Sequence, residues 1–282
     1  KQASRTGRDQ LVEYRSTGGA RFAPDVALDQ SAREEHVFMA QPIAEVAKTL
    51  QSAYDEQYTD KMSEWRELGG KYKAENIRNV CRKHRFSKVL ECGAGEGSIL
   101  KWLDASGVFP ELYAVEISDT GIQQIQKRHL GSLKEVKKFN GYEIPYPDKA
   151  FDMVYCSHVI EHVEHPRLLL RELKRVSNCQ VFEIPLDYSF RVDENVKHFL
   201  SYGHINIYTP SLFKFLLKSE GYEIVEEVLT QMDAEVMRFN WYKNMNLQKT
   251  SRRELSLRLH PLRNLLRRIK LGSDRYDEFG FS

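Results

Sequence analysis

The chain has 282 residues, 41% of them hydrophobic, including 14 phenylalanines and 14 tyrosines, which is enough apolar surface for a sizeable core. Its 42 basic and 40 acidic residues leave a net charge of +2, which argues against a nucleic-acid partner because such domains are usually strongly basic. No apolar run approaches the roughly 20 residues that span a bilayer, and we recognise no signal peptide.

The cysteines contain no C-x-x-C pair, and two of them fall within predicted core strands. This pattern favours free thiols in a reducing compartment, so we expect a cytoplasmic location. The four cysteines are Cys81, Cys92, Cys156 and Cys179.

In chain order, residues 1–35 are polar and are expected to form a loose arm. From Glu35 to Arg85 the apolar spacing is that of a helix. Strands and helices then alternate, which predicts a parallel sheet covered on both faces. The strands are expected at 88–92, 112–116, 136–139, 151–156 and 181–184, and the helices at 98–105, 119–129 and 166–176.

The alternation ends after Pro185. Residues 186–209 are rich in aromatic side chains and histidine, and a helix is expected from Pro210 to Glu220. Two further strands are predicted, at 222–229 and at 235–241.

The most informative segment is the glycine loop Glu91-Cys-Gly-Ala-Gly-Glu-Gly97, which follows the first strand. A dinucleotide fingerprint reads G-x-G-x-x-G, but here the third glycine comes one place early. Glycines permit a sharp turn and let a ligand approach backbone N–H groups at a helix N-terminus. Glu116 ends the next strand, where a carboxylate accepts hydrogen bonds from ribose hydroxyls. Glu91 suits a ligand with positive charge better than a pyrophosphate.

Two downstream segments extend the pattern. Residues 140–152, NGYEIPYPDKAFD, are similar to D-A-x-x-L-P-F-P-D-x-x-F-D, and residues 157–163, SHVIEHV, are similar to x-x-V-L-E-H-V. Together with E-x-G-x-G-x-G, these segments resemble the class I S-adenosylmethionine-dependent methyltransferases over roughly residues 72–229. The resemblance implies an α/β, Rossmann-like fold: a seven-stranded, mostly parallel sheet with an antiparallel last strand, helices on both faces and a helical N-terminal cap.

The resemblance, together with the composition of the two ends of the chain, predicts three regions. Residues 1–70 would form the N-terminal arm and helical cap, in which Tyr54, Tyr58 and Trp65 either close over the cofactor or pack as an ordinary helix core. Residues 71–242 would form the S-adenosylmethionine-binding methyltransferase domain, with a substrate insert at 186–209. Residues 243–282 would form a basic amphipathic C-terminal tail.

S-adenosylmethionine is the implied cofactor. The glycine loop would line its methionine part, Glu91 would orient the amino group, and Glu116 would bind the ribose. Asn140 stands where the family commonly has Asp facing the adenine, and an amide oxygen still accepts that bond. The implied cofactor-binding residues are Glu91, Gly93, Ala94, Gly95, Glu116, Ile117, Asn140, Gly141, Tyr142, Ser157 and His158.

A sulfonium already activates its methyl group, so the protein mainly holds the acceptor in line and excludes water, which contributes about 7–11 kcal/mol. A hydroxyl acceptor also benefits from a base, by about 10²–10⁴-fold. The candidate bases, in order, are His158, His204 and His162, because histidine titrates near neutrality. His165, before Pro166, is interpreted as a helix-start residue.

No metal is expected. Glu161, His162, Glu164 and His165 contain ligand atoms, but on one short helix they spread over too wide an arc. The segment also lacks the paired acidic motif of magnesium-dependent catechol-type enzymes.

The C-terminal tail carries leucines at helical spacing among many arginines. Such a helix lies on an anionic membrane or, the interpretation we favour, packs on the domain or on a partner subunit. Pro261 is expected to interrupt the helix or start a second one. The leucine-rich positions are Leu255, Leu259, Leu262, Leu266 and Ile269.

The sequence therefore predicts methyl transfer to a small molecule, most simply to a hydroxyl of a sugar-containing or aromatic compound. The alternatives are N- or C-methylation with the same cofactor site, or a cofactor-binding scaffold without catalysis. The expected state is a monomer or homodimer.

Overall fold

The computed structural model describes residues 63–188, 192–201 and 203–279. All of them belong to one compact unit, Ile43–Ser282. The predicted arm, and the cap residues Tyr54 and Tyr58, lie outside the described residues.

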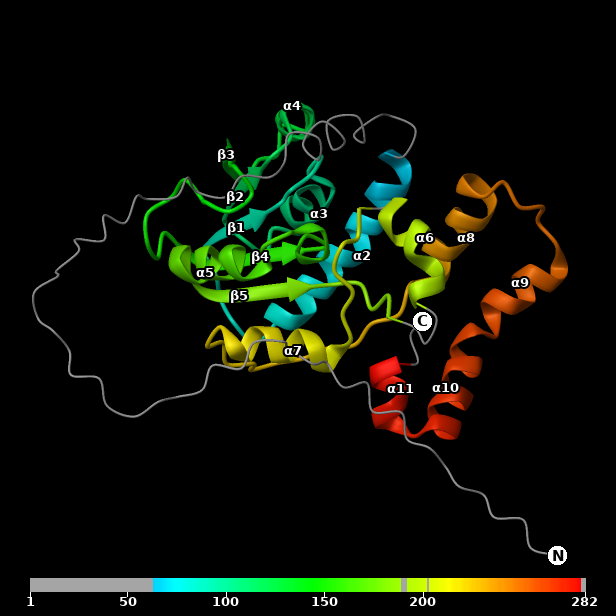
Figure 1. The fold of residues 1–282 in the computed structure, drawn as a ribbon. Helices are drawn as coiled ribbons and strands as arrows, with labels where there is room; N and C mark the ends of the chain where they lie inside the picture. Colours follow the sequence, from blue (N-terminus) through cyan, green and yellow to red (C-terminus); the bar gives the residue numbers. More distant parts are fainter. Residues whose placement is uncertain (1–62, 189–191, 202, 280–282) are drawn as a thin grey trace, which may run out of the picture. The chain divides into compact units, whose positions relative to one another are not determined.

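The centre of this unit is a five-stranded parallel sheet with the order β3-β2-β1-β4-β5 (Figure 1). The chain reverses its direction of travel across the sheet between β1 and β4, and ligands of such sheets bind at the carboxyl ends of these strands. The strands are β1 Lys88–Cys92, β2 Glu111–Glu116, β3 Leu133–Lys138, β4 Phe151–Ser157 and β5 Ser177–Glu183.

Helices cover both faces of the sheet, as predicted. Successive strand side chains point to opposite faces, so Val89 packs with one set of helices, α2, α3 and α4, while Leu90 and Cys92 pack with α5 and α7. The helices are α2 Ser63–Cys81, α3 Ser98–Ser106, α4 Asp119–Lys127, α5 Pro166–Val176 and α7 Pro210–Ser219.

Local signals set the helix starts. The side chain of Ser118 accepts a hydrogen bond from the Gly121 N–H (3.1 Å) and caps α4. Pro166 lies in the first turn of α5, directly after His165, the helix-start residue expected from the sequence.

Two predicted strands are wrong. Residues 222–229 form no regular element, and the Tyr222 hydroxyl instead donates to the Leu170 carbonyl of α5 (2.6 Å). Residues 235–241 lie in helix α8, Ala234–Phe239, and the π-helical turn Asn240–Asn244, because Asp233 caps this segment by accepting from the Glu235 N–H (2.7 Å). Among the described residues, the class I sheet therefore has five parallel strands.

The insert and the tail are also helical. The insert contains the 3₁₀ turn Val192–Asn195 and α6 Val196–Ser201, and the tail contains α9 Ser251–Arg258, α10 His260–Leu271 and α11 Ser273–Phe279. Pro261 lies in the first turn of α10. Of the two expectations for this proline, the start of a second helix is therefore confirmed.

The tail contacts the domain through polar side chains. Glu278 of α11 accepts from the Thr209 and Ser211 hydroxyls at the start of α7. The five predicted apolar tail residues, Leu255 to Ile269, are instead exposed. Within the described helices, no stretch is both long and apolar enough to cross a membrane. All four cysteines are free thiols.

Helix α2 packs closely on the start of α3 and runs without interruption across residue 70. A Cβ on Gly70 would lie 2.8 Å from the Ser98 carbonyl carbon, so only glycine allows this approach. Beside it, the Arg66 guanidinium pairs with Glu96 of the glycine loop (2.7 Å), and Arg128 after α4 donates to the Glu96 carbonyl (2.7 Å). These contacts fix the loop against α2 and α4.

Two glycines of α2 give a test of this packing. Gly70→Ala should lower the free energy of unfolding by about 1–3 kcal/mol, because the added methyl meets backbone rather than a movable side chain. Gly69→Ala is the matched control, since it has open space and should stabilise the helix by about 0.5–1 kcal/mol. Denaturant unfolding measures both; two effects of the same sign would contradict the packing argument.

Candidate functional site

The glycine loop joins β1 to α3 and depends on glycine geometry. Gly93, Gly95 and Gly97 have φ values of +75°, +56° and +78°, in the left-handed region that favours glycine. The Gly93 N–H donates to the Val115 carbonyl of β2 (2.9 Å), and a Cβ on Gly93 would lie 2.5 Å from Val159. The loop therefore needs glycine for both conformation and space.

Glu116, at the carboxyl end of β2, binds this loop directly. Its Oε2 accepts from the Gly95 N–H (2.7 Å) and its Oε1 from the Ser118 N–H (3.0 Å), and the residue is only 3% exposed. The carboxylate predicted to bind ribose is thus held in place by the loop and by the start of α4.

Glu91 is a second buried carboxylate, at the end of β1. Its Oε2 accepts from the Tyr155 hydroxyl of β4 (2.7 Å). The pKa of Glu91 is raised to about 8: burial is the largest cause and the charge of Glu116 adds to it, while the Tyr155 hydrogen bond and Lys73 act in the opposite direction. A cationic ligand would relieve the cost of ionising Glu91 here.

The carboxyl end of β4 meets that of β5 and helix α2. The Ser157 hydroxyl donates to Glu183 Oε2 (2.6 Å), and the Asn76 amide donates to Glu183 Oε1 (2.7 Å). Sequence reasoning missed Asn76 and Glu183, although Glu183 lies next to the last residue of a predicted strand, at the ligand side of the sheet.

His158 follows Ser157 in a strained conformation. Its φ is +55°, unusual for a residue with a side chain, and its N–H donates to the Glu183 carbonyl (2.8 Å). Its side chain is 32% exposed. Desolvation, followed by the positive charge of Lys73, lowers the pKa of His158 well below its usual value, so the imidazole is neutral.

Asn140 and Tyr142 form part of the turn around Gly141. Asn140 Oδ1 accepts from the Tyr142 N–H (3.0 Å) and the Glu143 N–H (2.7 Å), so this oxygen shapes the turn around Gly141. The Tyr142 ring is 4% exposed within the core, and its hydroxyl accepts from the His165 N–H (3.2 Å). A bond from adenine to Asn140 Oδ1 has to compete with both backbone donors.

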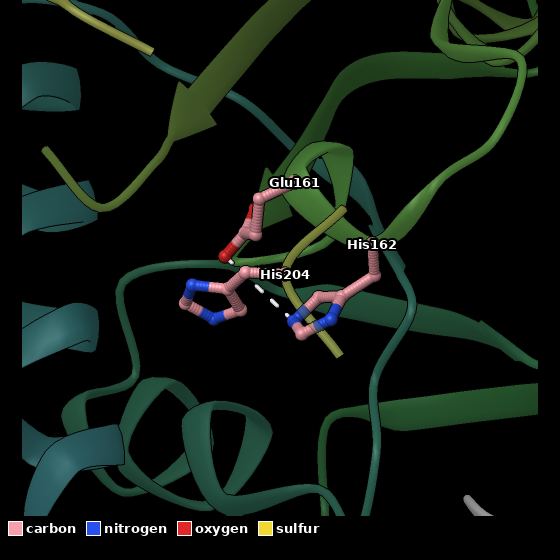
Figure 2. Close-up of side chains that lie close together, drawn as sticks. All are labelled: Glu161, His162 and His204. Atoms are coloured by element: carbon pink, nitrogen blue, oxygen red, sulfur yellow. Dashed lines mark ion pairs between the residues drawn. The ribbon is translucent and has the colours of Figure 1, made fainter. Parts of the chain in front are cut away.

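Three side chains from two distant segments, Glu161, His162 and His204, converge (Figure 2), and His158 Nδ1 lies 3.4 Å from Glu161 Oε1. Glu161 and His162 belong to the 3₁₀ turn Ile160–His162, and His204 comes from the insert. The His162 and His204 rings lie edge to face with their centroids 4.8 Å apart. The sequence grouped Glu161 and His162 with Glu164 and His165; the structure brings Glu161 and His162 together with His204.

One cavity of about 1440 Å³ connects these regions, and its lining extends to the C-terminal helices. Lys73 and Asn76 of α2, Glu183 and Asp187 also line it. Asn140 does not contribute to the lining. The predicted residues that do are Glu91, Gly93, Ala94, Gly95, Glu116, Ile117, Gly141, Tyr142, Ser157, His158, His162 and His204.

The lining fits a cationic nucleoside cofactor. Two buried carboxylates, Glu91 and Glu116, and the loop with its positive-φ glycines border the same cavity at the switch point of the sheet. Among the described residues, none of the ion pairs involves Glu91, so a positive charge in the ligand complements it.

Comparison with known proteins gives the class. A family model described as a methyltransferase domain matches residues 49–227, which is more than half of the chain. The protein YrhH of Bacillus subtilis (strain 168), which is named as a methyltransferase, is 29% identical over 91 residues, 32% of this chain and 51% of YrhH. The demethylmenaquinone methyltransferase of Geobacillus kaustophilus is 28% identical over 160 residues, 53% of this chain and 64% of that protein.

A crystal structure from Thermotoga maritima, described as an S-adenosylmethionine-dependent methyltransferase, has a TM-score of 0.48 and 20% identity. The match covers 61% of this chain and 81% of that one. The chain belongs to the methyltransferase-domain family. Its fold class and its cofactor, S-adenosylmethionine, are those of the class I methyltransferases, as predicted. The chain matches between 51% and 64% of the length of the two named relatives.

The raised pKa of Glu91 leads to a prediction of how the stability of the ligand-free protein depends on pH. Its pKa of about 8 lies above the ordinary 4.5, so between these pH values the fold keeps a proton that the unfolded chain has released. The stability of the wild type should therefore fall as the pH rises through this window. Glu91→Gln should lose part of that pH dependence, measured by thermal unfolding across the window.

The groups that face Glu91 are Lys73 of α2, Tyr155 of β4 and Glu116 of β2, and all three stay in the variant. Glu64→Gln, at an exposed carboxylate of α2, is the matched control and should keep the wild-type profile. Identical profiles for the wild type and Glu91→Gln would show that folding does not raise the pKa of Glu91.

Proposed function

We propose that this protein transfers a methyl group from S-adenosylmethionine to a hydroxyl of a small molecule. The observation that carries the proposal is the convergence of the glycine loop, two buried carboxylates and His158 on one cavity. The cofactor supplies an activated methyl group. The residues of this chain bind the cofactor, orient the acceptor and exclude water.

The cofactor-binding residues divide between its two ends. Gly93, Ala94 and Gly95 border the methionine part, with Glu91 toward the ammonium group. Glu116 is positioned for the ribose hydroxyls, because its carboxylate is already fixed by two backbone N–H groups. Ile117, half-buried beside it, and Gly141 border the adenine.

His158 is the proposed base for the acceptor. It lies at the carboxyl end of β4, lines the cavity and is neutral, as a proton acceptor must be. Its backbone N–H bond to Glu183 and the neighbouring Ser157–Glu183 bond fix its position. A sugar-containing or aromatic acceptor stays a prediction from the sequence; the described insert residues that line the cavity are Leu186, Asp187, His204 and Ile205.

Methyl transfer itself is tested with methyl-labelled S-adenosylmethionine and a panel of small sugars and phenols. Labelled product that is stable as an ether supports the proposal. A labelled amine or a new carbon–methyl bond would assign N- or C-methylation instead. If no acceptor gave a labelled product, the result would favour a cofactor-binding protein without catalysis.

Glu116→Gln should weaken S-adenosylhomocysteine binding by roughly 10-fold or more. The amide loses one charged acceptor, and hydrogen bonds to charged groups contribute about 1.5–3 kcal/mol. Isothermal titration measures the affinity. Glu111→Gln, at the opposite end of the same strand, is the control and should bind S-adenosylhomocysteine as the wild type does. If both variants bound it with equal affinity, Glu116 would not be a cofactor-binding residue.

His158→Gln should lower kcat for a hydroxyl acceptor by about 10²–10⁴-fold at saturating S-adenosylmethionine. The reason is that glutamine fills similar space but does not accept a proton from the hydroxyl. Steady-state kinetics with the acceptor found above measure the effect. Full turnover in this variant would mean that the acceptor needs no base.

A further inference from the structure

We propose that Glu161, His162 and His204 bind one divalent transition-metal ion at the acceptor side of the cavity. The site itself is argued from these three side chains. Its role in the reaction, which is to bind the acceptor oxygen, rests on the proposed function.

The distances suit a metal centre. One ligand atom from each of the three residues lies within 4.8 Å of the other two, and His162 Nε2 lies 3.8 Å from Glu161 Oε1 (Figure 2). Ligands at roughly 2.0–2.2 Å around a tetrahedral zinc ion are about 3.4 Å apart. Side-chain movements of about 1 Å or less would therefore complete the site.

Glu161 gives the independent indication of a ligand. Its side chain is 1% exposed, and neither carboxylate oxygen has a hydrogen-bond partner among the described residues. A buried carboxylate without such partners is costly, and buried charges are ordinarily paired or coordinate metals. The carboxylate is directed toward the two imidazoles in Figure 2.

The backbone holds the two ligand-bearing segments together. The Glu161 carbonyl accepts from the Ile205 N–H (3.0 Å) and the Asn206 N–H (2.9 Å), and the Asn206 amide donates to the Val163 carbonyl (2.7 Å). The insert residue His204 is thereby fixed beside the 3₁₀ turn that carries Glu161. The earlier expectation of no metal considered only residues on one helix and did not include His204.

Each imidazole also has an outer partner of the kind found at metal sites. His162 Nδ1 lies 2.9 Å from the Gly203 carbonyl, and His204 Nδ1 lies 2.6 Å from Asp187 Oδ2. Such partners accept a hydrogen bond from Nδ1–H, orient the ring and leave Nε2 as the coordinating nitrogen. The His204–Asp187 pair corresponds to the carboxylate–histidine–metal arrangement.

Two imidazoles and one carboxylate favour Zn²⁺, Mn²⁺, Fe²⁺ or Co²⁺ over Mg²⁺ and Ca²⁺, which prefer oxygen ligands. Three protein ligands leave coordination positions for an acceptor oxygen. The ion would polarise the acceptor hydroxyl, whose proton passes to His158. The oxygen then forms a bond to the methyl carbon while the methyl–sulfur bond breaks and its electron pair stays on sulfur.

Metal binding is tested on the full chain after chelation and dialysis, by titration with Zn²⁺ and with Mn²⁺. The wild type should bind one ion per chain. His204→Gln should weaken binding by about 10-fold or more, and Asp187→Asn by about 10–100-fold. His129→Asn, at an exposed histidine after α4, is the control and should bind as the wild type does.

Unchanged S-adenosylhomocysteine affinity shows that each variant is folded. A wild type that binds less than one ion, or a His204→Gln variant that binds as tightly, would overturn the site. The visible spectrum of Co²⁺ bound to the wild type needs no variant: nitrogen and oxygen coordination supports the site, and thiolate coordination contradicts it. A bound ion without methyl transfer to any hydroxyl would overturn the proposed function and leave the metal site standing.

Discussion

The whole site depends on one hydrogen bond, from the Gly95 N–H to Glu116 Oε2 (2.7 Å). It joins the loop after β1 to the carboxylate that ends β2, and parallel register makes this contact possible because Cys92 pairs with Val115 beside it. The bond fixes a carboxylate and a backbone turn against each other before any ligand arrives. Cofactor recognition is therefore preorganised by the sheet rather than by a mobile loop.

Acidic side chains gather at the same edge. Glu116 and Glu183 end β2 and β5, Glu91 is the second-last residue of β1, and Glu161 lies in the 3₁₀ turn after β4. Glu91 and Glu161 have raised pKa values because burial disfavours their charge. Concentrating buried carboxylates lowers stability unless cations or donors compensate. A sulfonium cofactor beside Glu91 and a metal ion beside Glu161 would each supply that compensation. Binding of these positively charged ligands would therefore also stabilise the fold.

Local patterns in the sequence predicted the glycine loop, all five strands and the helices between them, because strand burial and helix caps are set within a few residues. The predictions failed where distant segments compete. Tyr222 bonds to α5 instead of joining the sheet, and Asp233 caps a helix where a seventh strand was expected. Likewise, no spacing rule brings His204 to Glu161, since their contact depends on how the insert folds back.

The central claim is that the carboxyl edge of β1, β2 and β4 binds S-adenosylmethionine. Hydrogen–deuterium exchange with and without S-adenosylhomocysteine tests it most directly, because it locates the ligand on the wild-type chain. We expect protection of the amides of residues 93–97, Ile117 and Gly141, with no change at residues 169–173 of α5, which do not line the cavity. Protection confined to the C-terminal helices, with the glycine loop unchanged, would contradict it.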